Sequence, residues 1–389
     1  MKSVRSVVRP GIRSGVLGNR LLWPILVLVA LLIATRLQAP NFFEIRVVRG
    51  NLFGSLINIA RNTAPTLLVG LGMTLVIATR GIDLSVGAVA AISGAAATMY
   101  LQGTGEPNRI VNVLCAVGIG LGLAAVCGAW NGFLVTVLGI QPIIATLVLM
   151  TAGRGVAQLI TDEQIITVRS QPYKLIGGGY WLGLPFSIIL ACAIFVLTAL
   201  LTRRTALGVL LESVGVNPEA SRLAGVRSRS ITWTVYIICA VFAGLAGLMI
   251  TSNATAADPN GTGQFLEIDA ILAVVIGGTS LAGGRFSLGG TLVGAFIIQT
   301  MTTMILTLGI APEITLVYKA AIVAVVCLIQ SQEARALVGR LIFQRPAKST
   351  AEPPAAVDGD GLHGDGPQAA PIVDVSELVT VASDVTGES

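Results

Sequence analysis

Charged residues are scarce in this sequence: Asp, Glu, Lys and Arg make up 12% of its 389 residues, whereas 54% are hydrophobic. A soluble globular domain carries about 25% charged residues. The mean hydropathy is +0.83, which is strongly apolar for a chain of this length. These values exclude an ordinary soluble enzyme, a disordered protein and a small disulfide scaffold. They indicate a polytopic membrane domain.

The residue types on which most catalytic sites depend are also few. The single histidine, His363, lies in the polar C-terminal region, so the body has no histidine metal site and no Ser-His-Asp triad. None of the four lysines, Lys2, Lys174, Lys319 and Lys348, follows a glycine. A Walker A loop needs Gly-Lys to bind phosphates, so any ATP hydrolysis must come from another polypeptide. We expect no metal or cofactor on this chain and no enzyme activity of its own.

Ten apolar segments approach the length of about 20 residues that a spanning helix needs. They follow a basic N-terminal segment, 1–20, and one charge-free stretch is split in two because Pro142 disfavours helix at the residue before it. The segments are 21–35, 56–79, 84–101, 111–138, 143–160, 184–202, 231–252, 266–279, 288–308 and 314–330. The sequence therefore predicts an all-α membrane bundle of about ten transmembrane helices over residues 21–335. Segments 80–84 and 266–284 are re-entrant in the alternative interpretation.

The distribution of basic residues predicts on which side of the membrane each loop lies. The loop 203–230 carries five arginines against two glutamates, so the positive-inside rule predicts that it and both termini are cytoplasmic. The cytoplasmic tail, 336–389, holds one basic and eight acidic residues from about 347 onward, which predicts disorder there. Because the basic residues flank apolar spans, they indicate a lipid bilayer and no nucleic-acid partner.

The loop 203–230 also contains a helix pattern that a plain connector does not need. Asn217 or Pro218 can begin a helix, Glu219 suits its first turn, and Gly225 can end it. A short helix on the cytoplasmic face is typical of a docking element for a soluble partner, and the alternative is a basic connector. The expected docking residues are Glu212, Gly215, Asn217, Pro218, Glu219, Ala220 and Gly225.

Four charged residues lie at membrane depth. Asp83 separates two apolar runs, Glu267 and Asp269 open a span, and Lys319 lies in the last span. Such residues are costly in a bilayer and usually face a pathway or a partner. An ion-coupled secondary transporter of a small polar solute would use one or two of these carboxylates. Asp83 also fits a helix N-cap.

Small residues recur at the four-residue spacing that lets helix backbones approach closely. Gly118 and Gly122 form one such pair, and Gly290 and Gly294 form another. The spacing predicts tight helix packing and identifies no activity.

Three motifs resemble those of the ribose-type ABC sugar permeases. The first, residues 72–87, reads GMTLVIATRGIDLSVG, the second spans 215–225, and the third spans 269–286. The resemblance covers residues 20–335, and the stretch 151–161 is most similar to galactofuranose importer permeases. The family usually has glycine where Arg80 stands. The signature residues that the resemblance places on the pathway are Gly81, Asp83, Ser85 and Gly87.

The resemblance implies the membrane subunit of an ABC importer for a monosaccharide such as ribose, galactose or galactofuranose, in a bacterial inner membrane. A second permease chain, identical or paralogous, would complete the pathway. Separate P-loop ATPase subunits that use ATP and Mg would dock at the loop 203–230, and an external or periplasmic sugar-binding protein would deliver the substrate. The sugar would cross by alternating access.

Several polar and aromatic side chains on the expected spans are candidates for sugar contact. Sugars are held by planar polar groups and aromatic rings in largely apolar pockets. The candidates on the expected spans are Asn58, Asn62, Trp130, Asn131 and Gln299. For each of them, hydrogen bonding between helices is an equal alternative.

Overall fold

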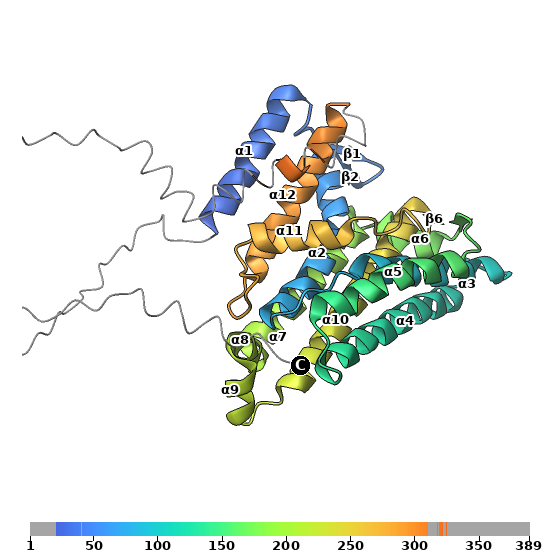
Figure 1. Cartoon of the computed structure of the whole chain (residues 1–389). Coiled ribbons are helices and arrows are strands. Elements are labelled where there is room, and N and C mark those ends of the chain that lie inside the picture. The colour runs from blue at the N-terminus through green and yellow to red at the C-terminus, as the bar shows by residue number, and fades with distance from the viewer. Residues whose placement is uncertain (1–20, 40, 310–316, 318, 322–323, 325–389) are drawn as a thin grey trace, which may run out of the picture. The chain divides into compact units, whose positions relative to one another are not determined.

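The computed structural model describes residues 21–39, 41–309, 317, 319–321 and 324, and this part of the chain is mostly helical (Figure 1). The helices are α1 (Leu22–Gln38), α2 (Ser55–Ala78), α3 (Val86–Gly103), α4 (Ile110–Thr136), α5 (Pro142–Ile160), α6 (Gln171–Gly177), α7 (Phe186–Arg204), α8 (Leu207–Val216), α9 (Pro218–Leu223), α10 (Ser228–Ala254), α11 (Leu266–Ile276) and α12 (Leu288–Thr307). Three short antiparallel pairs join β1 (Arg46–Val48) to β2 (Asn51–Phe53), β3 (Ile166–Thr167) to β6 (Ala256–Ala257), and β4 (Tyr180–Trp181) to β5 (Leu184–Pro185).

Six of the described helices, α3, α4, α5, α7, α10 and α12, are long and apolar enough to cross a membrane. A multi-pass helical bundle is thereby confirmed, but the count of ten is not. Helix α1 has 17 residues, and α2 carries Arg61 and Asn62 in its first half. Of the last expected span, 314–330, only residues 317, 319–321 and 324 are described. The segments 1–20 and 336–389 lie outside the described residues.

The segment 266–279 is too short to be a full span. Helix α11 has 11 residues, so it rises about 16 Å, roughly half of a hydrocarbon core of about 30 Å. The backbone before it, from Asp258 to Phe265, is not helical. Non-helical backbone is tolerated at membrane depth only where protein or water covers it. These helix bounds fit the re-entrant alternative.

The breaks between helices follow the local sequence. Helix α4 ends at Thr136 and α5 begins at Pro142, with Gly139 in the left-handed region at φ 71°. Proline is pre-organised for the first helical turn and glycine for positive φ. The turn expected between the second and third spans is also present, because α2 ends at Ala78 and α3 begins at Val86.

The core lies where α10 packs against α2, α3 and α4. The second half of α2 is almost completely buried, as is most of α3. By contrast, α4, α5 and α7 each bury only 22% of their apolar window. Their remaining surface is suited to lipid or to another chain, which is the distribution expected of a membrane bundle.

Close helix packing uses a different glycine stripe from the expected one. Among the described residues, a Cβ atom on Gly118 or Gly122 would meet nothing within 4 Å, so the predicted tight packing of this pair is wrong for this part of the chain. The opposite face of α4 carries the packing stripe, which comprises Ala116, Gly120, Ala124, Gly128 and Gly132. The prediction for Gly290 and Gly294 on α12 is confirmed. A Cβ atom on Gly290 would collide with Gly277 O, and one on Gly294 would collide with Ala273 O of α11.

We expect Gly128→Val to destabilise the protein and Gly122→Val, on the same helix, to leave its stability unchanged. A Cβ at Gly128 would lie 2.6 Å from Ala240 Cβ and 2.7 Å from Tyr236 O. Overpacking of this kind costs about 1–3 kcal/mol. Thermal unfolding in detergent measures the difference. Equal melting temperatures for the two variants would contradict the assigned packing face.

Candidate functional site

The segment after α7 folds into two short helices at one end of the bundle, α8 and α9 (Figure 1). Asn217 is the N-cap of α9, and its Oδ1 accepts hydrogen bonds from the backbone N–H groups of Glu219 at 3.1 Å and Ala220 at 3.0 Å. Gly225 follows the helix with φ 86°. The short helix expected between Asn217 and Gly225 is therefore confirmed.

An exposed ion pair strengthens α9. Arg222 donates from Nη2 to Glu219 Oε1 at 2.6 Å, one helical turn away. This hydrogen bond raises the pKa of Arg222 above its ordinary value. Exposed pairs contribute little stability, so the Asn217 cap contributes more to the local order of α9.

All three sequence motifs meet beneath α8. The N–H of Gly284 donates to Ala78 O at 3.0 Å, and Arg80 donates from Nη2 to Val216 O. A Cβ atom on Gly215 would collide with Ala78 O and with Gly284 N, so only glycine fits there. The end of α2, the turn before α12 and the end of α8 thus form one tightly packed junction.

Arg80 stands where the resemblance to sugar permeases leads to the expectation of glycine, and the local backbone has a conformation that suits glycine. Its φ of 65° lies in the left-handed region, which costs a non-glycine residue energy. The hydrogen bond to Val216 O offsets this cost by joining the signature turn to α8.

A groove of about 550 Å³ runs between α8 and α9. Glu212, Asn217 and Ala220 line it, together with Arg285 from the third motif. Of the other expected docking residues, Gly215 is buried beneath the groove, and Pro218, Glu219 and Gly225 are exposed beside it. The expected set is therefore brought together on one surface, with a carboxylate and a guanidinium available to a partner.

The signature turn is held by a buried polar network. Asp83 is fully buried, and its Oδ1 accepts hydrogen bonds from the Ser85 N–H at 3.0 Å and the Ser85 hydroxyl at 2.6 Å. Asn131 Nδ2 donates to Ser85 Oγ at 2.8 Å and approaches Asp83 Oδ1 at 3.4 Å. The N-cap residue of α3 is Ser85, so Asp83 stabilises the preceding turn and does not cap the helix.

The signature glycines are buried at close contacts. A Cβ atom on Gly81 would collide with Tyr236 Oη, and one on Gly87 would collide with Glu267 Oε2. In this conformation Gly81, Asp83, Ser85 and Gly87 hold helices together and do not face an open path.

The remaining charges at membrane depth also have structural contacts. Lys319 Nζ lies 2.9 Å from Asp269 Oδ2 in a largely buried ion pair. Arg154 donates to Thr262 O at 2.6 Å and to Gly263 O at 2.8 Å, which satisfies non-helical backbone before α11. Glu267 is 5% exposed, and its interaction with Arg154 is electrostatic. None of these contacts favours an ion-coupled carrier.

A polar chamber of about 340 Å³ lies at the other half of α2. Its volume falls within the range of about 300–1,000 Å³ that is usual for small-molecule sites. Asn62 and Gln299, far apart in the sequence, both line it, as do Arg61, Ser187 and Asn253. The chamber therefore unites two of the expected substrate-facing residues.

The other three candidates lie elsewhere. Asn58 is exposed one turn before Asn62 on α2 and is not among the residues that line the chamber. Trp130 is 52% exposed on α4, with its ring 6.3 Å from that of Phe133. Asn131 is buried in the signature network, which is the helix-bonding alternative considered from sequence.

Arg61 is a chamber residue that the sequence patterns did not single out. Its Nε is buried and has no hydrogen-bond partner within the described part of the chain. A lone arginine six residues into an apolar helix was the available signal, since charges at membrane depth mark functional sites by default.

Apolar spans around a polar chamber define the class of this protein, a multi-pass membrane permease. A family model described as branched-chain amino acid transport system / permease component matches residues 55–329, and the chain belongs to this family.

Curated relatives cover most of the chain. The galactofuranose transporter permease protein YtfT of Escherichia coli K12 is 47% identical over 326 residues, which cover 82% of this chain and 94% of the relative. The fructose import permease protein FruF of Bifidobacterium longum is 40% identical, with coverage of 87% and 96%. The ribose import permease protein RbsC of E. coli K12 is 35% identical, with coverage of 79% and 93%. The resemblance to sugar importer permeases is confirmed.

One solved structure, an inward-facing ABC transporter of the metal-chelate type, aligns over 83% of this chain and 98% of its own. Its identity is 13% and its TM-score is 0.42. The family assignment accordingly rests on the sequence relatives.

We expect Asn131→Leu to lower stability by about 1–3 kcal/mol, because the buried Ser85 hydroxyl and Asp83 carboxylate lose a donor. The control is Asn112→Leu, a partly buried asparagine at the start of the same helix, whose side chain donates to Glu106 O outside the Asp83 network. Thermal unfolding and transport kinetics separate the alternatives. A raised KM for the transported substrate with unchanged stability would contradict the structural role and indicate that Asn131 contacts substrate.

Proposed function

We propose that this chain is the permease subunit of an ATP-binding-cassette importer that carries a monosaccharide across a bacterial inner membrane. The observation that carries the proposal is the junction where Ala78, Gly215 and Gly284 meet beneath α8. Such a junction gives a docked ATPase a rigid connection to α2. The relatives named for galactofuranose, fructose and ribose support the substrate class.

The partners follow from this role. A P-loop ATPase subunit, which uses ATP and Mg, docks at the groove between α8 and α9. A second permease chain completes the pathway, and an external or periplasmic sugar-binding protein delivers the sugar. The chain itself performs no covalent chemistry. In this arrangement the segment 203–230 and both termini are cytoplasmic, because the arginines of that segment favour the inner side.

The polar chamber is the proposed sugar-contact site on this chain. Asn62 and Gln299 offer amide donors and acceptors, and Arg61 offers a planar set of donors that suits neighbouring hydroxyl groups. Asn58, one turn further along the exposed face of α2, extends this polar surface away from the chamber.

Purification of the tagged protein in mild detergent, followed by mass spectrometry, tests the assembly. We expect a P-loop ATPase to copurify and to be lost from Asn217→Ala, because removal of an N-cap costs a helix about 1 kcal/mol. The control Ser170→Ala removes the cap of α6 instead. Retention of wild-type ATPase by Asn217→Ala would overturn the docking assignment.

Gly225→Val tests coupling at the same surface. The φ of 86° at Gly225 disfavours any side chain, although a Cβ atom there would meet no described residue within 4 Å. We expect membrane insertion to be intact and ATP hydrolysis to be uncoupled from uptake. Normal uptake by this variant would contradict the proposal.

Arg61→Gln tests the chamber in proteoliposomes that contain the ATPase and the binding protein. We expect the KM for the transported sugar to rise roughly 10- to 100-fold, the equivalent of the 1.5–3 kcal/mol of a hydrogen bond to a charged group. Labelled ribose, fructose and galactose are the probes, and Arg109→Gln, at an exposed loop position, is the control. An unchanged KM would exclude sugar contact by Arg61. Absence of uptake of every sugar by the wild type would instead overturn the proposed function.

A further inference from the structure

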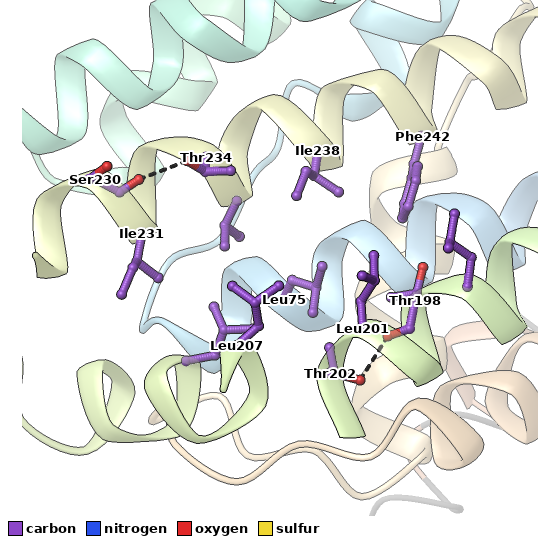
Figure 2. A pocket seen from close by; sticks show the side chains of 13 residues that line it. Leu75, Thr198, Leu201, Thr202, Leu207, Ser230, Ile231, Thr234, Ile238 and Phe242 are labelled. Atoms are coloured by element: carbon purple, nitrogen blue, oxygen red, sulfur yellow. Dashed lines mark hydrogen bonds between the residues drawn. The ribbon is translucent and has the colours of Figure 1, made fainter. Parts of the chain in front are cut away.

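Two cavities beside α2 differ in what they offer a sugar. The groove of about 310 Å³ between α7 and α10 is lined largely by apolar side chains, and its Thr202 and Thr234 hydroxyls donate to carbonyls of their own helices at 2.8 and 3.0 Å (Figure 2). The polar chamber, by contrast, is lined by Arg61, Asn62 and Gln299. The residues that fix the walls of the chamber therefore bear on the proposed transport.

Part of the chamber wall depends on the connecting segment, residues 255–265, which joins α10 to α11. Asn253 and Ala254, directly before this segment, line the chamber, and so does Leu266, directly after it. Helix α11 packs mainly on α12 and α2, so the connecting segment determines where the first turn of α11 lies relative to the end of α10. A shift of this segment would move Leu266 against Asn253 and reshape the chamber.

The connecting segment does not adopt its conformation by local preference. Thr255 and Phe265, at its two ends, have φ angles of 54° and 60°, in the left-handed region. This region is costly for a β-branched or bulky residue, and such strain persists only where the surrounding structure over-determines the backbone. The pairing of β6 with β3 holds the first end of the segment, and the second end needs contacts of another kind.

Arg154, on α5, supplies contacts of that kind. Its Nη1 donates to Thr262 O at 2.6 Å, and its Nη2 donates to Gly263 O at 2.8 Å. Thr262 and Gly263 are buried, and a buried carbonyl without a donor is costly. One helical turn later on α5, Gln158 Nε2 donates to Asn260 Oδ1 at 2.7 Å. The planar guanidinium thus binds two consecutive carbonyls of the connecting segment, a geometry that its fork of donors suits.

The signature residue Gly87, at the start of α3, packs against the same part of the segment. A Cβ atom on Gly263 would lie 2.7 Å from Gly87 O, and one on Gly87 would lie 2.5 Å from Gly263 O and 3.3 Å from Arg154 Nη2. Glu267, in the first turn of α11, also lies against Gly87 and interacts electrostatically with Arg154. The second end of the connecting segment is therefore held between α3 and the Arg154 side chain.

We infer that Arg154 is a positioning residue for the chamber. By binding the carbonyls of Thr262 and Gly263, it fixes the connecting segment against α3 and so sets Leu266 at the chamber wall. Arg154 is not among the residues that line the chamber, so it acts through the segment and not on the substrate. This role rests on the proposed function, in which the chamber holds the sugar.

Arg154→Met tests this role, because it keeps a long side chain and removes every donor. The full chain is assayed in proteoliposomes with the ATPase and the binding protein, and hydrogen–deuterium exchange is followed over residues 253–266. We expect the KM for the transported sugar to rise roughly tenfold, as for the loss of a hydrogen bond to a charged group, with kcat unchanged. Exchange over 253–266 should quicken roughly tenfold, because the segment opens locally. Arg154→Lys keeps a charged donor and should recover most of both losses.

Gly128→Val is the control, because it destabilises the contact between α4 and α10 away from the connecting segment. It should lower the melting temperature and leave KM and the exchange over 253–266 at their wild-type values. A lower melting temperature of Arg154→Met with unchanged KM would overturn the inference, since Arg154 would then serve stability alone. A raised KM with unchanged exchange would also overturn it, because Arg154 would then act on the sugar directly. Exchange needs no transported sugar, so it decides on Arg154 even if the wild type takes up no sugar, a result that would overturn the proposed function.

Discussion

The backbone hydrogen bond from Gly284 to Ala78 is the constraint on which the functional part of this structure depends. It brings the turn before α12 onto the end of α2 at a distance of 3.0 Å. Gly215 lies so close to both that no side chain fits. In an apolar bundle such direct backbone contact is strong because water does not compete for the donors and acceptors. Main-chain atoms therefore fix the position of α8 against the bundle. The exposed side chains of α8 and α9 do not take part in this contact and can vary to suit a partner.

Helix α2 connects the two sites. It carries Arg61 and Asn62 at the polar chamber and Ala78 at the junction, with the intervening residues buried on nearly all sides. The separation from Asn62 to Ala78 is about 24 Å along the helix. A packed helix of this kind transmits tilt or rotation better than bending. Movement at the proposed docking surface would reach the chamber through this helix, which contains Pro65 at its chamber end.

Much of this was predictable from the sequence, and the failures have physical causes. The α9 helix was predictable because Asn217, Pro218 and Gly225 act locally. The glycine stripe on α4 was not, because Gly118 and Gly122 have the same spacing as Gly120 and Ala124, and only tertiary packing distinguishes the faces. Likewise Asn131 and Asn62 are both asparagines on apolar helices. Only Asn131 lies opposite Asp83 and Ser85 in the bundle, so Asn131 is buried in a hydrogen-bond network and Asn62 is not.

The two faces of α4 also differ in how freely they can evolve. On the face that contains Gly120 and Gly128, each added methyl group would collide with α3 or α10, so substitutions there require compensating changes on a neighbouring helix. On the face that contains Gly118 and Gly122, any residue compatible with lipid is accommodated. Divergence among permeases of this kind should therefore accumulate along one side of a single helix, and the narrow packing stripe should change only in pairs.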